Sequence, residues 1–251
     1  MGARAGVAVV TGFNLSPRVE HAWPTRKPWS PAEADTGDLW PDNGRVRTPG
    51  VGLKLSGHRG ASLYNQRMRI GVLALQGAFR EHAAVLRRLG VDVTEVRLPE
   101  QLDGLDGLVI PGGESTAMLR LMGLYGLDEA IRVFERPIFG TCAGLIVLDR
   151  DRLGLIDITS ERNAFGRQVA SFETTLAIAG DDEPFTAVFI RAPWITEAGP
   201  GVAILAEVDG HPVLAREGRI LVASFHPELT DDPRVHERFL EIVREEQSVR
   251  A

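Results

Sequence analysis

Apolar and polar positions follow a regular pattern only from Met68 onward. Beyond that residue, short apolar runs of strand length alternate with amphipathic segments of helical period. The expected strands lie at 70–75, 93–96, 107–110 and 137–140, and the expected helices at 80–89 and 115–124. A β-α-β alternation favours a mostly parallel sheet with helices on both faces, in which ligands bind at the carboxyl ends of the strands.

After Leu155 the pattern changes to short apolar runs separated by Gly and Asp turns. Strands are expected at 172–178, 185–190, 202–208, 212–215 and 220–224. We expect them to extend the same sheet in antiparallel fashion, with an amphipathic helix at 233–246 closing the domain. The predicted fold class is therefore α/β, a three-layer sandwich whose central sheet is mostly parallel with an antiparallel extension.

Residues 1–67 show no sustained period of 2 or 3.6 and contain many prolines and glycines. We interpret them as an extension that is disordered or not native, and predict that one domain occupies residues 68–251, with Met68 as the natural start. The extension holds Trp23, Trp29 and Trp40, so a docking or regulatory arm built on these side chains remains an alternative.

Composition narrows the class of partner. The formal charge of −6 argues against nucleic acid, whose binding requires many Lys and Arg contacts to phosphates. No stretch approaches the roughly 18 consecutive apolar residues of a membrane span, so no membrane partner is expected. Cys142 is the only cysteine, which forbids an intramolecular disulfide and gives no sign of an oxidising compartment. A cytoplasmic protein that binds a small polar substrate or another protein is expected.

The single cysteine lies in Gly140-Thr141-Cys142-Ala143-Gly144, directly after a buried strand and before the helical run 145–148. Small residues on both sides permit the sharp strand-to-helix turn of a nucleophile elbow. A helix N-terminus would also stabilise the reactive thiolate. A buried structural cysteine is the alternative interpretation of this motif.

His226 and Glu228 follow another apolar strand, in Ser224-Phe225-His226-Pro227-Glu228. Pro227 favours an extended conformation at His226, and a two-residue offset in extended chain puts both side chains on one side. A carboxylate beside an imidazole fixes its tautomer and stabilises the imidazolium. The alternative is a surface pair near a turn. The other histidines, His82 and His236 among them, are interpreted as solvated or structural, and the acidic run 181–183 as a solvated turn.

A third motif, Pro111-Gly112-Gly113-Glu114-Ser115, lies between a strand and a helix. Paired glycines let backbone N–H groups point into a pocket, which suits an oxyanion hole. Together and in this order, the three motifs resemble class I glutamine amidotransferases, whose fold is flavodoxin-like and whose triad is Cys-His-Glu. The segments 75–77, 161–168 and 189–193 further resemble the glutaminase subunits of pyridoxal 5'-phosphate synthases. One departure is a short connection at 147–152.

The resemblance implies a role for each matching residue. Cys142 would be the nucleophile, His226 the general base and acid, and Glu228 its orienting partner. The residues expected to contact glutamine are Gly113, Glu114, Ser115, Arg162, Ile190 and Arg191. The residues expected to form or activate the oxyanion hole are Gly112, Gly113, Ala143 and Gln76. Neither a metal nor another cofactor is expected.

The resemblance also implies a reaction and a partner. The chain would hydrolyse L-glutamine to L-glutamate and ammonia through a thioester, and pass the ammonia to a separate synthase (lyase) subunit in a multimeric complex for vitamin B6 biosynthesis. A glutaminase subunit of another pathway, such as histidine or anthranilate synthesis, is one alternative. A catalytically silent docking subunit is another, although the intact Cys142, His226 and Glu228 argue against it.

Overall fold

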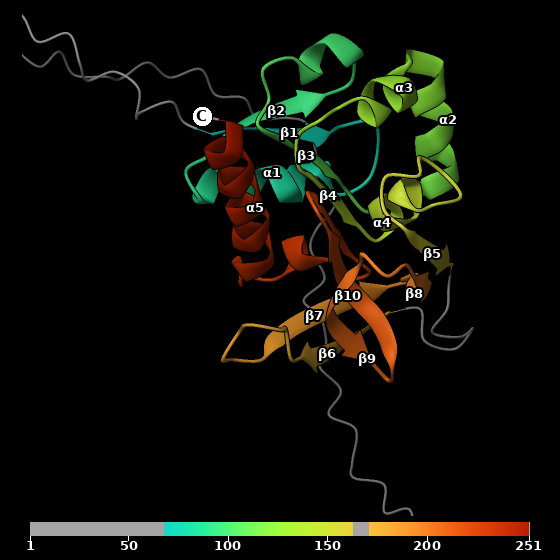
Figure 1. Cartoon of the computed structure of the whole chain (residues 1–251), viewed down its shortest axis with the longest axis vertical. Helices are drawn as coiled ribbons and strands as arrows, with labels where there is room; N and C mark the ends of the chain where they lie inside the picture. Colours follow the sequence, from blue (N-terminus) through green and yellow to red (C-terminus); the bar gives the residue numbers. More distant parts are fainter. Residues whose placement is uncertain (1–67, 163–170, 251) are drawn as a thin grey trace, which may run out of the picture. The chain divides into compact units, whose positions relative to one another are not determined.

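Fully buried strands form the centre of the fold, because β3 (Gly107–Ile110), β4 (Ile138–Thr141) and β11 (Ile220–Ala223) expose none of their residues. The structure, a computed structural model, describes residues 68–162 and 171–250. These strands belong to a seven-stranded sheet with the order β2-β1-β3-β4-β11-β10-β9 (Figure 1). Its other strands are β1 (Arg69–Leu73), β2 (Asp92–Val96), β9 (Ala203–Val208) and β10 (His211–Glu217).

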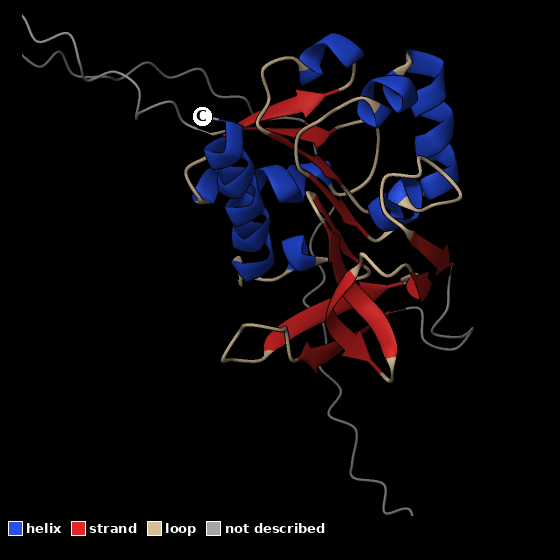
Figure 2. Cartoon of the chain, in the orientation of Figure 1, coloured by secondary structure: helices blue, strands red, loops and turns tan. Residues whose placement is uncertain are grey.

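Five neighbouring strands of this sheet, from β2 to β11, are parallel, and β10 and β9 continue it in antiparallel fashion. Helices cover both faces (Figure 2). One face carries α1 (Phe79–Arg88) and α5 (Arg234–Arg250). The other face carries α2 (Ser115–Tyr125), α3 (Leu127–Arg132) and α4 (Ala143–Leu148). The predicted three-layer α/β sandwich is therefore confirmed.

Alternation along β11 shows how one strand serves both layers. Leu221 and Ala223 pack into the core beside α1 and α5, whereas Ile220 and Val222 pack into the core beside the other helices. A strand with both faces covered must be apolar throughout, which is why it appears in the sequence as a continuous run. Among the described residues, no helix combines the length and the apolar character needed to span a bilayer.

The second half of the chain departs from the prediction. β6 (Ser171–Leu176) and β7 (Phe185–Ile190) form a separate antiparallel pair, and so do β5 (Ile158–Glu161) and β8 (Trp194–Ala198). Among the described strands only β9 and β10 extend the central sheet in antiparallel fashion, while β11 pairs in parallel with β4. The expectation of one continuous antiparallel extension was wrong because local patterns do not reveal which strands pair.

The sequence pattern also missed some short elements. These are α3, β5, β8 and the 3-10 helices η1 (Pro99–Leu102) and η2 (Pro227–Leu229). Gly126 separates α2 from α3 in a left-handed conformation with φ of 72°, so one apolar stretch becomes two helices. β5 and β8 are largely exposed or half-buried and carry few apolar residues that would mark them as strands.

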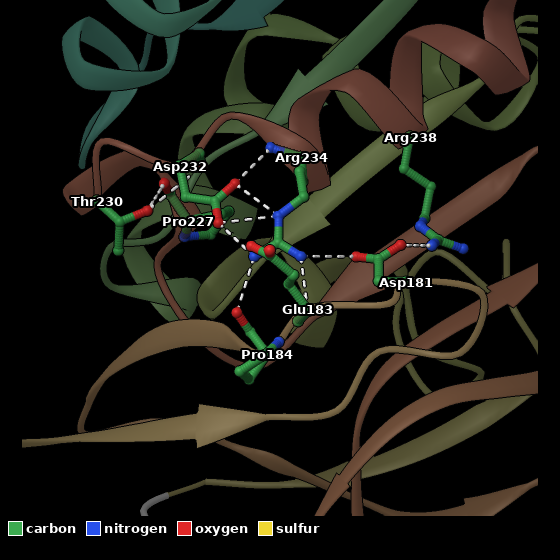
Figure 3. Close-up of polar contacts among 8 residues, drawn as sticks. All are labelled: Asp181, Glu183, Pro184, Pro227, Thr230, Asp232, Arg234 and Arg238. Carbon is green, nitrogen blue, oxygen red and sulfur yellow. Dashed lines mark hydrogen bonds and ion pairs between the residues drawn. The ribbon is translucent and has the colours of Figure 1, made fainter.

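The start of α5 is fixed by a cluster of ion pairs (Figure 3). Arg234 forms ion pairs with Asp232 at 2.6 Å and with Asp181 at 3.4 Å, and donates to the carbonyl of Pro184 at 2.9 Å. Arg238 pairs with Asp181 at 2.6 Å. Asp181 is thus an ion-pair partner and not the solvated turn residue expected from the sequence. The cluster ties α5 to the turn that precedes β7.

The register of the parallel strands brings the three motifs together. Ile110 of β3 pairs with Gly140 of β4, and Ala223 of β11 pairs with Thr141. Each of these strands ends directly before a motif: the Gly-Gly loop, Cys142 and the His226 turn respectively. Since carboxyl ends of neighbouring parallel strands meet at one edge, the motifs lie side by side there.

Candidate active site

Cys142 occupies a sharp turn between β4 and α4, with φ of 48° and ψ of −104°. The turn requires small neighbours. A Cβ on Gly144 would overlap the backbone carbonyl of Ile110, and one on Gly140 would lie 2.8 Å from the backbone of Gly144. The N–H of Cys142 donates to the carbonyl of Ala223 at 2.8 Å, which ties the turn to β11. The observed geometry is that of a nucleophile elbow.

His226 and Glu228 form a close pair beside this turn. Nδ1 of His226 donates to Oε1 of Glu228 over 2.6 Å, and the two residues are only 7% and 6% exposed. The N–H of His226 donates to the carbonyl of Val188 at 2.8 Å. Glu228 lies in the 3-10 helix η2, which begins at Pro227. The contact predicted between the two side chains is present, but a helical turn and not extended chain produces it.

The pair carries a strong electrostatic bias. Burial lowers the pKa of His226, but hydrogen bonds with Cys142 and Glu228 and the charges of both outweigh burial and raise that pKa to about 10. Burial raises the pKa of Glu228. The charge of His82 when protonated, together with the hydrogen bond and charge of His226, outweighs burial and brings that pKa below its usual range. The arrangement therefore favours a protonated His226 held between Glu228 and Cys142.

The loop between β3 and α2 is fixed by Gln76 and Glu114. The side-chain amide of Gln76 donates to the carbonyl of Glu114 at 2.9 Å and accepts from its N–H at 3.2 Å. The Glu114 carboxylate caps α2 by accepting from the N–H groups of Ala117 and Thr116. These two backbone hydrogen bonds, with that of Ala117 first, lower the pKa of Glu114. The loop is thus rigidly attached to the first strand and the helix.

The paired glycines of this loop are closely packed. A Cβ on Gly112 would lie 3.0 Å from Nδ1 of His226 and 3.3 Å from Cβ of Cys142. A Cβ on Gly113 would lie 2.6 Å from the Nε2 atom of Gln76. Glycine is therefore the residue that lets the loop approach both the cysteine and the histidine.

The orientation of the Gly112 carbonyl is also set by the first loop, because it accepts a hydrogen bond from the N–H of Ala78 at 3.1 Å. The intervening residue, Gly77, has φ of 85°, and a Cβ there would overlap that same carbonyl. Loop 76–78 therefore controls which way the glycine peptides point.

A cavity of about 290 Å³ opens over Cys142. Its lining residues are Gly113, Glu114, Ser115, Cys142, Ala143, Ile146, Arg162, Ile190, Arg191 and His226. All of these except Ile146 were singled out from the sequence. Ile146 lies four residues after Cys142 and so on the same side of α4, a spacing that could have identified it.

The remaining predicted residues, Gly112, Gln76 and Glu228, do not line the cavity but support residues that do. The two arginines lie at its rim. Both are exposed, and Nη1 of Arg162 donates to Oγ1 of Thr116 at 3.0 Å. Arg191 has φ of 44°, a conformation that costs a non-glycine residue roughly 1–3 kcal/mol and is frequent at functional sites. The part of the 161–168 motif that follows Arg162 lies outside the described residues.

Sequence reasoning missed His82. It was interpreted as solvated or structural, yet its Nε2 lies 3.2 Å from Oε2 of Glu228 and its side chain is fully buried. On α1 it shares an apolar face with Ala83, Val85 and Leu86. A histidine in that position looks like a core residue, so only the three-dimensional contact reveals the link to Glu228.

Comparisons with known proteins agree with this geometry. The sequence model of the SNO glutamine amidotransferase family matches residues 72–245. The chain is 52% identical over 187 residues to the pyridoxal 5'-phosphate synthase subunit PdxT of Thermosipho africanus. This alignment covers 70% of this chain and 100% of that protein. The protein of the same name from Geobacillus kaustophilus is 54% identical over 188 residues, which are 71% of this chain and 96% of that protein. A crystal structure of a glutamine amidotransferase, 48% identical, superposes with a TM-score of 0.66 over 69% of this chain and 98% of that one.

Proposed function

The chain belongs to the SNO glutamine amidotransferase family, and we infer that it is the glutaminase subunit of a pyridoxal 5'-phosphate synthase. It hydrolyses L-glutamine to L-glutamate and ammonia, and the ammonia serves vitamin B6 biosynthesis. The observation that carries this function is that Cys142 and His226 line one cavity at the carboxyl edge of the parallel strands, with Glu228 hydrogen-bonded to His226 behind it.

The proposed reaction begins with attack of the Cys142 sulfur on the side-chain amide carbon of glutamine. The carbonyl π electrons move to oxygen, and backbone N–H groups near Gly113 and Ala143 stabilise the oxyanion. His226 then gives its proton to the departing nitrogen, so ammonia leaves and a thioester remains. Neutral His226 next takes a proton from water, whose oxygen attacks the thioester and releases glutamate and the thiolate. Glu228 keeps the imidazole oriented throughout.

Substrate recognition is assigned to the rim and floor of the cavity. Arg162 and Arg191 offer guanidinium groups that can pair with the α-carboxylate of glutamine. Gly113, Ser115 and Ile190 line the same space, and Glu114 does so while its carboxylate caps α2. The backbone carbonyl of Ile190 lies 3.9 Å from the Cys142 sulfur, so this strand end is close enough to position the amide of the substrate.

The partner is a separate synthase subunit that takes up the ammonia. The relatives are named as subunits of that synthase, which favours this pathway over histidine or anthranilate synthesis. Residues 68–251 form the proposed amidotransferase domain, and residues 1–67 are proposed to be an extension of it. The family match at 72–245 and the 70% of the chain covered by a full-length relative support this division. A cytoplasmic location stays a prediction.

The experiment that tests the function is glutamine hydrolysis by the full chain mixed with its synthase subunit. An electrophilic glutamine analogue should inactivate the enzyme and label one residue, Cys142, as read by peptide mass spectrometry. Excess glutamine should protect against labelling. Labelling at another residue, or inactivation without labelling of Cys142, would refute the assignment of the nucleophile. A chain that binds the synthase but releases no ammonia would instead support the silent docking subunit.

A further inference from the structure

A second histidine, which does not line the cavity, lies against the carboxylate of Glu228. Nε2 of His82 is 3.2 Å from Oε2, whereas Oε1 accepts the hydrogen bond from His226. Within the described residues Oε2 accepts no hydrogen bond of good geometry, so the contact with His82 is close but imperfectly aligned. Both side chains are completely buried. His82 therefore faces the half of the carboxylate that His226 leaves unused.

His82 is itself held from two further elements. Its Nε2 lies 3.0 Å from the hydroxyl of Thr141, the residue before the nucleophile, at the end of β4. Its Nδ1 lies 2.9 Å from Nε2 of His236 on α5, which is also fully buried. One ring on α1 thus connects the strand that carries Cys142 with the turn that carries Glu228.

The contacts select one tautomer of His82. Burial lowers the pKa of His82 and lowers that of His236 to about 3, so both rings are neutral near pH 7. With its proton on Nε2, His82 presents an N–H to Thr141 and Glu228, and its Nδ1 accepts from His236. Of the nitrogens of the two rings, only an acceptor, Nδ1 of His236, then stays unpaired. The opposite arrangement would aim a lone pair at the carboxylate and bury an unpaired N–H, which costs more.

We propose that His82 is a positioning residue for glutamine hydrolysis, whose Nε2–H holds the carboxylate of Glu228 in the orientation that aligns His226 with Cys142. The inference rests on the proposed triad. A carboxylate anchored at only one oxygen can rotate about its side-chain bonds and carry the imidazole with it. Because a displacement of about 1 Å can cost roughly a hundredfold in rate, a second anchor on the carboxylate affects turnover directly.

The first test uses the wild-type full chain in complex with its synthase subunit. ¹⁵N-labelled histidine reports the tautomer of each ring by NMR, and the His82 signals are assigned by their loss in His82→Gln. We expect a neutral ring with its proton on Nε2 at pH 7 and above. A His82 ring protonated on Nδ1 alone would overturn the proposal without any variant having to be active.

The second test separates positioning from packing with two amide side chains. The amide nitrogen of glutamine can reach the place of Nε2, whereas that of asparagine reaches only the place of Nδ1. His82→Asn should lower kcat for glutamine hydrolysis by about ten- to hundredfold, the effect of one lost hydrogen bond to a charged group, with KM within about twofold. His82→Gln should recover most of kcat. Equal kcat values for the two variants, or an asparagine variant within about twofold of wild type, would refute the proposal.

Two controls complete the design. Val85→Ala lies on the same helix, is also buried and does not contact Glu228 through a polar atom. It should lower the melting temperature through lost packing but leave kcat unchanged, so a loss of kcat in this control would mean that stability alone explains the effect. Cys142→Ala is measured alongside. If that variant keeps its activity, the proposed triad fails; if it is inactive and the His82 variants are normal, only the role of His82 fails.

Discussion

Gly112→Ala should disable the site while leaving the fold intact. The new Cβ would lie 3.0 Å from Nδ1 of His226 and 3.3 Å from Cβ of Cys142, and closer still to Cε1 of the same ring. Ordinary contacts between such atoms are about 3.5–4.0 Å, so the contact with Cε1 forces the imidazole to move by roughly 1–1.5 Å. A displacement of that size between reacting groups costs about a hundredfold in rate. Gly112 has a φ that alanine can adopt, so backbone strain adds little.

The assay is steady-state ammonia release from glutamine by the full chain with its synthase subunit. We expect kcat to fall about a hundredfold, with a melting temperature close to that of wild type. The matched control is Gly123→Ala, because a Cβ there, in the last turn of α2, meets nothing closer than 3.8 Å. That change should leave kcat unaltered and raise stability by about 0.5–1 kcal/mol. A Gly112→Ala enzyme with more than half of the wild-type kcat would refute the close packing of this loop against His226.

Three further outcomes are expected. A chain that begins at Met68 should fold and hydrolyse glutamine as the full chain does; loss of soluble protein on truncation would show that residues 1–67 are structural. Ammonia release should be low for the isolated chain and rise with the synthase subunit; equal rates with and without the partner would contradict this. In the presence of the synthase subunit, Gln76→Ala should lower the rate of ammonia release by roughly a hundredfold, because Gln76 holds the backbone at Glu114 beside the oxyanion loop. Hydrogen bonds and neighbouring charges raise the pKa of His226 to about 10 against the effect of burial. Protonated His226 should therefore stabilise the fold fully below pH 6.5, and this contribution should be lost as the pH rises through 10. An NMR titration that gives an ordinary pKa for His226 would refute this prediction.

Much of the parallel sheet could be predicted because its strands are recognisable locally. The strand expected at 107–110 coincides with β3, and that at 220–224 contains β11, since each is an apolar run bounded by turn residues. The candidate residues followed from the same reasoning, because Cys142 and His226 each come directly after a buried strand. The motifs meet at one edge because β11 runs parallel to β4, whereas the sequence pattern predicted an antiparallel strand there. The resemblance to class I glutamine amidotransferases, and not strand order, placed the three motifs in one site.

What could not be predicted depends on contacts between distant segments. The antiparallel pair of β6 and β7 alternates polar and apolar residues in the way that an edge extension of the main sheet would. Glu228 reaches His226 from the 3-10 helix η2, whose first residue is Pro227. A proline favours extended chain in the residue before it but is equally compatible with the first position of a helix, so the sequence did not reveal this turn. His82 lies on a buried helix face, where a histidine that only packs in the core would look the same in the sequence. Only its contact with Glu228 distinguishes a positioning role from a packing role.

The central claim is that Cys142 carries the glutamyl group during hydrolysis. It is tested most directly by comparing glutamate and ammonia release from the wild-type full chain and from Cys142→Ala, each saturated with the synthase subunit. We expect the variant to bind the synthase normally and to lose more than a thousandfold of the rate, because the nucleophile of a triad contributes far more than that. A variant that forms the complex and retains more than about a thousandth of the wild-type rate would contradict the mechanism.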